Sequence, residues 1–157
     1  MDPPSRRGRR ERKKERTRTA LMEVAIRLIG ERGIYGTRVE DITERSDLGK
    51  GAFYNYFESK EHLLAELVAQ GVALLHERYL ADLAPRSSAA KRAAAVVTAH
   101  AAFFADHPAY VILFHQTRGL TTVRSGEHGV LTTVFRAYLR QTGDVLVPPS
   151  STLVQRS

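Results

Sequence analysis

The chain of 157 residues is 43% hydrophobic, contains no cysteine and carries a formal net charge of +7 at pH 7. This hydrophobic share is enough for a packed core and excludes a globally disordered chain. The lack of cysteine excludes a disulfide framework, thiolate catalysis and cysteine-based zinc sites. The charged N-terminus lacks the apolar core of a secretory signal, and no apolar run approaches the roughly 18 residues that span a bilayer. We therefore expect a soluble, cytoplasmic protein.

The positive charge is concentrated at the N-terminus. Nine of the 24 Lys and Arg residues lie within residues 1–18, beside three acidic residues, so the rest of the chain is nearly neutral. We expect residues 1–17 to form a basic, flexible arm that suits a polyanion such as nucleic acid. A solvated terminus that only keeps the protein soluble is an equally good interpretation of these residues alone. A membrane surface is disfavoured, because no Trp, Phe or Leu insertion face lies beside the arm.

The first half of the chain predicts two helices up to residue 46. From Thr19, apolar residues recur at helical spacing, and Gly33 is placed where a C-terminal glycine ends a helix. Thr37 and Glu40 match a capping box, with Thr37 as N-cap and Glu40 reaching back. A short second helix over residues 39–46 should follow.

A tight turn and two more helices come next. Asp47 and Gly49 both tolerate the backbone angles of a turn, and a third helix should cover roughly residues 50–57. Ser59 can cap a fourth, long helix that runs to about Leu83. Two short helices joined by a three-residue turn, between longer helices, are typical of a helix-turn-helix.

The second half also has helical periodicity throughout. Three apolar stripes end at His107, at Gly119 and at Gly143. No stretch long enough for a strand alternates apolar and polar residues with a period of two. The segment after Gly143 contains Pro148 and Pro149, so an irregular tail is expected there. The fold class predicted is therefore all-α, without a sheet.

Residues 50–57 combine aromatic and small polar residues in a way that needs two different faces. Phe53 and Phe57 are four residues apart and share a buried face. The other side is left with Lys50, Gly51, Asn55 and Ala52, and it is slim enough to approach the floor of a DNA groove. A three-helix bundle with amphipathic surface tyrosines is the structural alternative, but the basic arm beside this segment favours DNA.

Residues 19–64, from "TALMEVAIRLIGERGIYGTRVEDIT" through "KGAFYNYFESKEHLL", resemble the DNA-binding domain of the tetracycline-repressor (TetR) family. The resemblance implies an all-α homodimer that acts as a ligand-responsive regulator, usually a repressor. It implies a helix-turn-helix DNA-binding domain over 18–64, a helical ligand-binding and dimerisation domain over 65–143 and an irregular tail over 144–157. Double-stranded DNA, a second subunit and a small-molecule effector are the implied partners.

The resemblance also assigns roles in DNA binding. The implied phosphate anchors are Thr37, Arg38, Tyr54, Tyr56 and Lys60. The residues that would face bases are Lys50, Gly51, Ala52 and Asn55. The Asn55 amide suits bidentate pairing with adenine, whereas Lys50 suits a guanine and a phosphate equally.

Two departures from the family pattern concern the turn and the C-terminus. Ser46 and Asp47 stand where the family usually has Ala and Gly, and Gly49 replaces a Ser or Thr cap. Family members continue into two further helices that pair between subunits, and residue 157 follows soon after the last stripe. One interpretation is therefore a shortened relative that binds DNA as a monomer, largely without sequence preference. The other is a dimer formed through the helix around residues 130–139.

Candidate ligand-binding residues lie on the stripes of the second half. His100 follows Val97 on a helical face, and the candidate set is His100, Phe103, Phe104, Phe114 and Tyr138. A hydrogen-bonded core histidine is the preferred alternative for His100. No histidine pair has metal-ligand spacing with a carboxylate, and no nucleophile turn or phosphate-binding glycine loop occurs. We expect no metal, no cofactor and no enzymatic activity.

Overall fold

The computed structural model describes residues 6–81, 83–84, 87–124 and 129–148. Every regular element in these ranges is a helix, which confirms the all-α prediction. The helices are α1 (Arg6–Arg32), α2 (Val39–Arg45), α3 (Lys50–Phe53), α4 (Lys60–Ala81), α5 (Ala89–Asp106), α6 (Pro108–Arg124) and α7 (Val130–Leu146).

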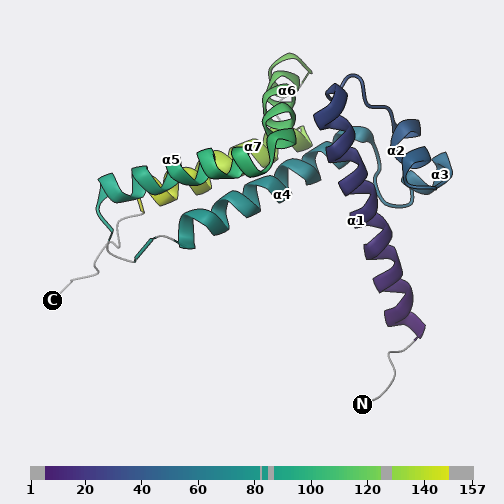
Figure 1. The fold of residues 1–157 in the computed structure, drawn as a ribbon, viewed down its shortest axis with the longest axis horizontal. Helices are drawn as coiled ribbons and strands as arrows, with labels where there is room; N and C mark the ends of the chain where they lie inside the picture. The colour runs from purple at the N-terminus through teal and green to yellow at the C-terminus, as the bar shows by residue number, and fades with distance from the viewer. Residues whose placement is uncertain (1–5, 82, 85–86, 125–128, 149–157) are drawn as a thin grey trace.

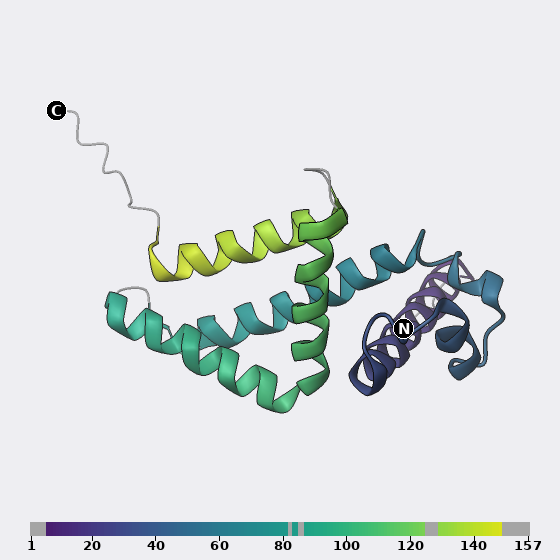
Figure 2. The ribbon, with the colours of Figure 1, turned by 90° about the horizontal axis from the view of Figure 1, so that it is seen from above.

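The helices form two groups joined by α4 (Figure 1). Helices α1, α2 and α3 pack together at one end of the molecule. Helices α5 and α7 lie along the C-terminal part of α4 and touch each other, and α6 crosses them (Figure 2). Helix α6 also packs against α1, so the two groups meet at the α1–α6 contact as well as through α4.

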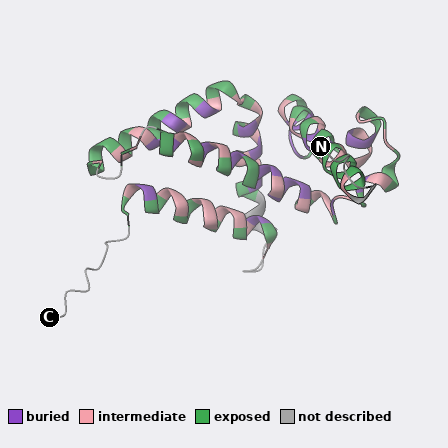
Figure 3. Cartoon of the chain, turned by 90° about the horizontal axis from the view of Figure 1, so that it is seen from below, coloured by how far each residue is buried: buried purple, intermediate pink, exposed green. Residues whose placement is uncertain are grey.

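Helix α1 is longer than the sequence pattern predicted. It begins at Arg6 and continues without interruption to Arg32, whereas a flexible arm was expected up to residue 17. Arg, Lys and Glu are good helix formers, so residues 6–18 can extend a helix that is already nucleated by its buried part. The extension projects away from the other helices (Figure 1), and residues Arg9 to Arg16 are exposed, as the green N-terminal part of α1 shows (Figure 3).

The predicted C-terminal end of α1 and the predicted N-cap of α4 are correct. Gly33 has φ 75°, and its N–H donates to the carbonyl of Ile29 at 2.8 Å, as in a glycine C-cap. The Ser59 hydroxyl accepts a hydrogen bond from the His62 N–H at 3.1 Å, which confirms Ser59 as the cap of α4.

The predicted capping box of α2 is wrong by one residue. Arg38 is the N-cap, and its N–H donates to the Asp41 carboxylate at 2.8 Å. Thr37 is fully buried, and its hydroxyl donates to the Gly33 carbonyl at 2.8 Å. Because the threonine hydroxyl is used by the end of α1, it does not cap α2.

Three other helix boundaries differ from the prediction. The third helix ends at Phe53, and the next residues form tighter turns, with Asn55 N–H donating to Ala52 at 3.2 Å. Helices α6 and α7 continue through Gly119 and Gly143, which were expected to end them. A glycine costs a helix only about 1 kcal/mol relative to alanine, which the packing of neighbouring turns can offset. Most of the expected tail, residues 149–157, lies outside the described residues.

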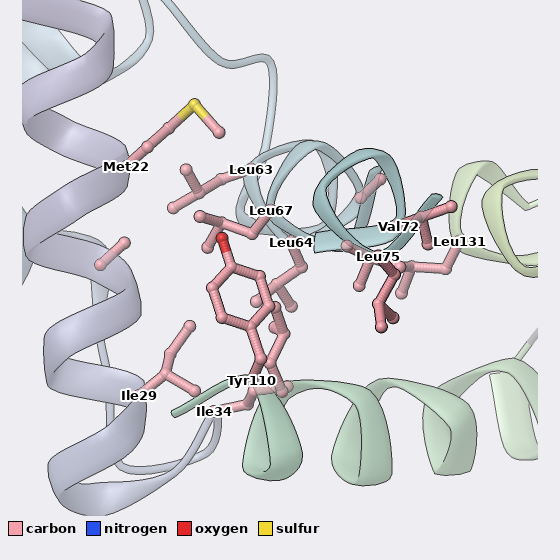
Figure 4. Close-up of a cluster of buried hydrophobic side chains, with 14 of the residues drawn as sticks. Met22, Ile29, Ile34, Leu63, Leu64, Leu67, Val72, Leu75, Tyr110 and Leu131 are labelled. Carbon is pink, nitrogen blue, oxygen red and sulfur yellow. The ribbon is translucent and has the colours of Figure 1, made fainter. Parts of the chain in front are cut away.

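One apolar core runs through both groups of helices. Its α4 part includes Leu63, Leu64, Leu67 and Leu75, all at most 2% exposed (Figure 4). Tyr110 of α6 lies beside this stripe and packs over Gly71 of α4. No single helix in the described ranges is long and apolar enough to cross a membrane, and only the pair Ala89–Asp106 and Pro108–Gly119, bent by 109°, passes that test together.

Glycine-to-alanine substitutions should separate this packing contact from helix propensity. A Cβ at Gly71 would lie 2.7 Å from the Tyr110 ring, so Gly71→Ala should lower the free energy of unfolding by roughly 1–3 kcal/mol. A Cβ at Gly119 would meet nothing within 4 Å, so Gly119→Ala should raise the free energy of unfolding by up to about 1 kcal/mol. Urea denaturation measures both, and an equal gain from the two variants would contradict the Gly71–Tyr110 contact.

Candidate nucleic-acid interface

Helices α2 and α3 are held on α1 and α4 by a small set of apolar side chains. Ile42, Phe53 and Phe57 are at most 1% exposed, and the Phe53 and Phe57 ring centroids lie 5.3 Å apart. The aromatic residues of the inner face therefore pack as the sequence predicted. This anchoring leaves the opposite side of residues 50–55 facing solvent.

The turn between α2 and α3 contains a backbone conformation that is unusual for a residue with a side chain. Asp47 has φ 54°, in the left-handed region. Its N–H donates to the Glu44 carbonyl at 3.1 Å, and the Leu48 N–H donates to the Thr43 carbonyl at 2.8 Å. These bonds close α2 in the manner of a helix that ends on a left-handed residue.

The outer face contains the residues that were expected to face bases. Lys50, Gly51 and Asn55 are exposed and Ala52 is half-buried. A Cβ at Gly51 would meet nothing within 4 Å, so this face is slim as well as open. Small residues beside an amide and an ammonium group allow close approach and hydrogen bonding to base edges.

The two tyrosines differ in exposure. Tyr54 is 55% exposed and its ring meets the Phe53 ring edge-on, with centroids 5.4 Å apart. Tyr56 is half-buried and packs against the core. Both lie next to the outer face, where a hydroxyl can donate to a phosphate oxygen.

Lys50 forms an ion pair with Glu40 of α2, a contact that sequence analysis missed. The Glu40 carboxylate raises the pKa of Lys50, and the hydrogen bond from Lys50 lowers the pKa of Glu40. Both groups are well solvated, so this pair adds little to stability. Its effect is on the outer face, where Glu40 offsets the Lys50 charge.

The side chain of Arg38 is the most open of the expected phosphate anchors, with 77% of its side chain exposed. Its guanidinium lies 3.7 Å from the Asp41 carboxylate, which also pairs with Arg32 at 3.1 Å. The hydrogen bond from the Arg38 backbone, together with these cations, lowers the pKa of Asp41. Thr37, by contrast, is buried, and its hydroxyl is already bonded to Gly33.

Lys60 lies at the start of α4 and reaches back to the α1–α2 turn. Its ammonium donates to the Ile34 carbonyl at 2.6 Å. Partial burial lowers its pKa from the ordinary lysine value. An ammonium group has three donors, so the bond to Ile34 leaves donors for a further acceptor.

Arg18 joins the basic part of α1 to α4. It forms an ion pair with Glu66, lies 3.6 Å from Glu15, and stacks over the Phe57 ring at 5.5 Å from its centroid. Glu66 also contacts His62 at 3.4 Å. Arg18 therefore fixes the basic part of α1 to α4.

The five candidate ligand residues come together in the second group of helices. His100 is near Phe104 and Tyr138, Phe103 is near Phe104, and Phe114 is near Phe104 and Tyr138, with ring centroids 5.3–6.1 Å apart. Val97, which the pattern placed on the same face, is 68% exposed. Since the rings pack on one another, a ligand at this position would have to part them.

His100 is fully hydrogen-bonded. Its Nδ1 lies 2.8 Å from the Val96 carbonyl, which can only accept, so Nδ1 carries the proton. Its Nε2 then accepts from the Tyr138 hydroxyl at 2.6 Å. Burial raises the pKa of Tyr138 and raises that of Tyr79, stacked on the same ring, to about 12. This arrangement matches the core-histidine alternative.

Comparison with known proteins shows what the DNA-binding part of the chain is similar to. Residues 21–67 match the model of the bacterial regulatory proteins of the tetR family. The HTH-type transcriptional repressor KstR2 of Rhodococcus jostii is 32% identical over 104 residues, which are 66% of this chain and 51% of that protein. Residues 21–67, which include the helix-turn-helix, therefore form a DNA-binding segment of the TetR type.

A further relative is similar in sequence, and two solved structures are similar in fold. The fatty acid metabolism regulator protein of Bacillus subtilis is 27% identical over 55% of this chain and 45% of its own length. The FadR structure from Bacillus halodurans superposes with a TM-score of 0.67 over 83% of this chain and 66% of that chain, at 18% identity. FadR of B. subtilis in complex with stearoyl-CoA gives a TM-score of 0.61 over 82% and 66%, at 22% identity. The chain spans about half the length of the curated relatives it matches, and these relatives are regulators rather than enzymes.

Asp47 provides a test of the turn geometry. Asp47→Gly should raise the free energy of unfolding by roughly 0.5–1 kcal/mol, because glycine adopts a positive φ without steric strain. Asp47→Ala removes the same charge but keeps a Cβ, and it should lower stability. Urea denaturation of both variants separates strain from charge. Equal shifts in the two would show that charge, not backbone angle, governs this position.

Proposed function

We propose that this chain acts as a ligand-responsive transcriptional repressor that binds a palindromic DNA operator as a homodimer. The observation that supports it most is the two-sided segment 50–57. Phe53 and Phe57 fix it on the core while Lys50, Gly51 and Asn55 stay open to solvent. A structural bundle alone has no need of such a slim, polar and firmly anchored outer face.

Within this proposal, each side chain has a distinct task at the DNA. Asn55 pairs with an adenine edge in the major groove, and Lys50 contacts a guanine or a phosphate once its bond to Glu40 is exchanged. Arg38, Tyr54 and Tyr56 hold phosphates beside the groove. Thr37 shapes the turn through Gly33, and Lys60 combines its bond to Ile34 with a phosphate contact.

A homodimer is needed to present two reading segments one helical turn of DNA apart, about 34 Å. The effector is a small molecule that binds in the helical half and separates the packed rings around His100. The stearoyl-CoA in the B. subtilis FadR structure makes long-chain acyl thioesters the first compounds to test. Binding that repositions α4 would change the separation of the reading segments and release the operator.

The function is tested by titrating the protein against the DNA upstream of its own gene and against a shuffled control, at two salt concentrations. Preference for the native DNA, with two protomers per complex in sedimentation, supports a dimeric repressor. Equal and steeply salt-dependent binding of single protomers to both DNAs would overturn it. That outcome favours the monomeric, largely non-specific alternative.

Asn55→Ala tests the reading face directly. We expect a loss of about 1–3 kcal/mol in operator binding, with little change on the shuffled control, because only the hydrogen bonds to a base are removed. Thermal unfolding should be unaffected, since Asn55 is exposed. Equal weakening on both DNAs would contradict base recognition by Asn55.

The basic part of α1 should contribute affinity without specificity. Arg9→Gln with Lys13→Gln removes two exposed charges one helical turn apart. We expect the salt slope of DNA binding to fall by about 0.9 for each phosphate that is no longer neutralised. Lys91→Gln with Arg140→Gln removes two exposed charges from α5 and α7 and serves as the matched control. Equal slopes for the two double variants would exclude a role for this part of α1.

A further inference from the structure

The backbone of Ile34, in the turn between α1 and α2, is held from two sides by side chains distant in sequence. Its N–H donates to the Gln116 side-chain oxygen of α6 at 2.7 Å. Its carbonyl accepts from the Lys60 ammonium at 2.6 Å. One residue of the DNA-binding part is thereby bonded to α6 on one side and to the start of α4 on the other.

The turn needs such a partner because of how α1 ends. Gly33 ends the helix with φ 75°, so the chain turns away from α1 and the Ile34 N–H needs an acceptor outside that helix. Ile34 is only 2% exposed, so water does not readily replace a missing acceptor. A Cβ at Gly33 would lie 2.9 Å from the Gln116 nitrogen, which shows how closely the amide lies across this backbone.

Helix α6 is pressed against α1 along one face. Ala109, Leu113 and Gln116 follow helical spacing on that face, and Leu113 is fully buried. A Cβ at Gly30 would lie 2.9 Å from the Ala109 Cβ, so the two helices approach each other closely there. The Gln116 amide is thus placed by packing and has little freedom to follow the turn if α6 moves.

The turn leads directly into the side chains proposed to meet DNA. Thr37 bonds back to Gly33, and Arg38 follows as the N-cap of α2. A change in the position of Ile34 would therefore reach Arg38 and the first turn of α2. Lys60 would respond as well, since its ammonium is bonded to the same residue.

We propose that Gln116 is a positioning residue for DNA binding, a role that rests on the function proposed above. Its amide oxygen holds the Ile34 N–H and keeps the α1–α2 turn in the shape that presents Arg38 to phosphate. The Ile34–Gln116 bond thereby ties the α1–α2 turn to the position of α6, in addition to the packing of α6 on α1. Gln116 itself does not touch DNA.

Two substitutions of Gln116 distinguish the effect of its hydrogen-bond acceptor from the effect of its side-chain volume. Gln116→Met keeps the length and removes the acceptor, whereas Gln116→Glu keeps an acceptor oxygen for the Ile34 N–H. His115→Gln changes an exposed neighbour on α6 and is the surface control. The readouts are amide hydrogen exchange at Ile34 in the free protein and affinity for the native upstream DNA at two salt concentrations.

For Gln116→Met we expect Ile34 exchange to accelerate about 10-fold and operator affinity to fall about 10-fold, as for removal of a buried hydrogen bond. The salt slope should stay unchanged, because no phosphate contact is removed. Gln116→Glu should restore both the slow exchange and the affinity, and His115→Gln should match the unmodified chain.

Unchanged Ile34 exchange in Gln116→Met would overturn the contact itself. Faster exchange with unchanged operator affinity would overturn the positioning role and leave Gln116 as a cap of the turn. If the unmodified chain shows no preference for the native DNA, the proposed function fails and the positioning role fails with it. The exchange measurement distinguishes this case, since it reports the contact without DNA.

Discussion

Helix α4 supplies apolar side chains to both groups of helices, and the arrangement of the molecule depends on this shared stripe. Leu63, Leu64 and Leu67 belong to the buried core at the end of α4 nearer α1 (Figure 4), whereas Tyr79, further along α4, stacks on His100 of α5 with ring centroids 5.4 Å apart. Because one continuous helix carries both sets, the two groups cannot move independently without bending α4 or breaking a packed layer. The α1–α6 contact closes a second connection between them, so the groups are linked at two points.

Local patterns were sufficient to predict the helices and several of their ends. Gly33 and Ser59 act through their own backbone conformation and hydroxyl, which are properties of nearby sequence. The capping box was misplaced because Thr37 has a competing acceptor in Gly33, a choice that only the folded turn decides. The ends at Gly119 and Gly143 were wrong for a similar reason, since packing of adjacent turns outweighs the modest cost of glycine in a helix.

The outer face of residues 50–55 was predictable from the spacing of Phe53 and Phe57. The ion pair and the hydrogen bond made by the lysines beside that face could not be predicted from the sequence. Glu40 meets Lys50 across two helices, and Lys60 meets the Ile34 carbonyl 26 residues away. Such contacts depend on the relative placement of elements, which periodicity does not encode. The ring cluster around His100 shows the same limit, because sequence places its members on faces but does not tell whether those faces enclose a cavity or fill it.

The unbroken course of α1 has a consequence for how the positive charge is delivered. A helix of 27 residues is about 40 Å long, so the basic residues sit on a rod that is clamped at Arg18. A disordered tether would lose chain entropy on meeting a polyanion and could reach it in many directions. The rod has already lost that entropy during folding, and it fixes the direction in which the charges lie. Wherever α2 and α3 dock, the cationic end of α1 must follow at a set distance and angle.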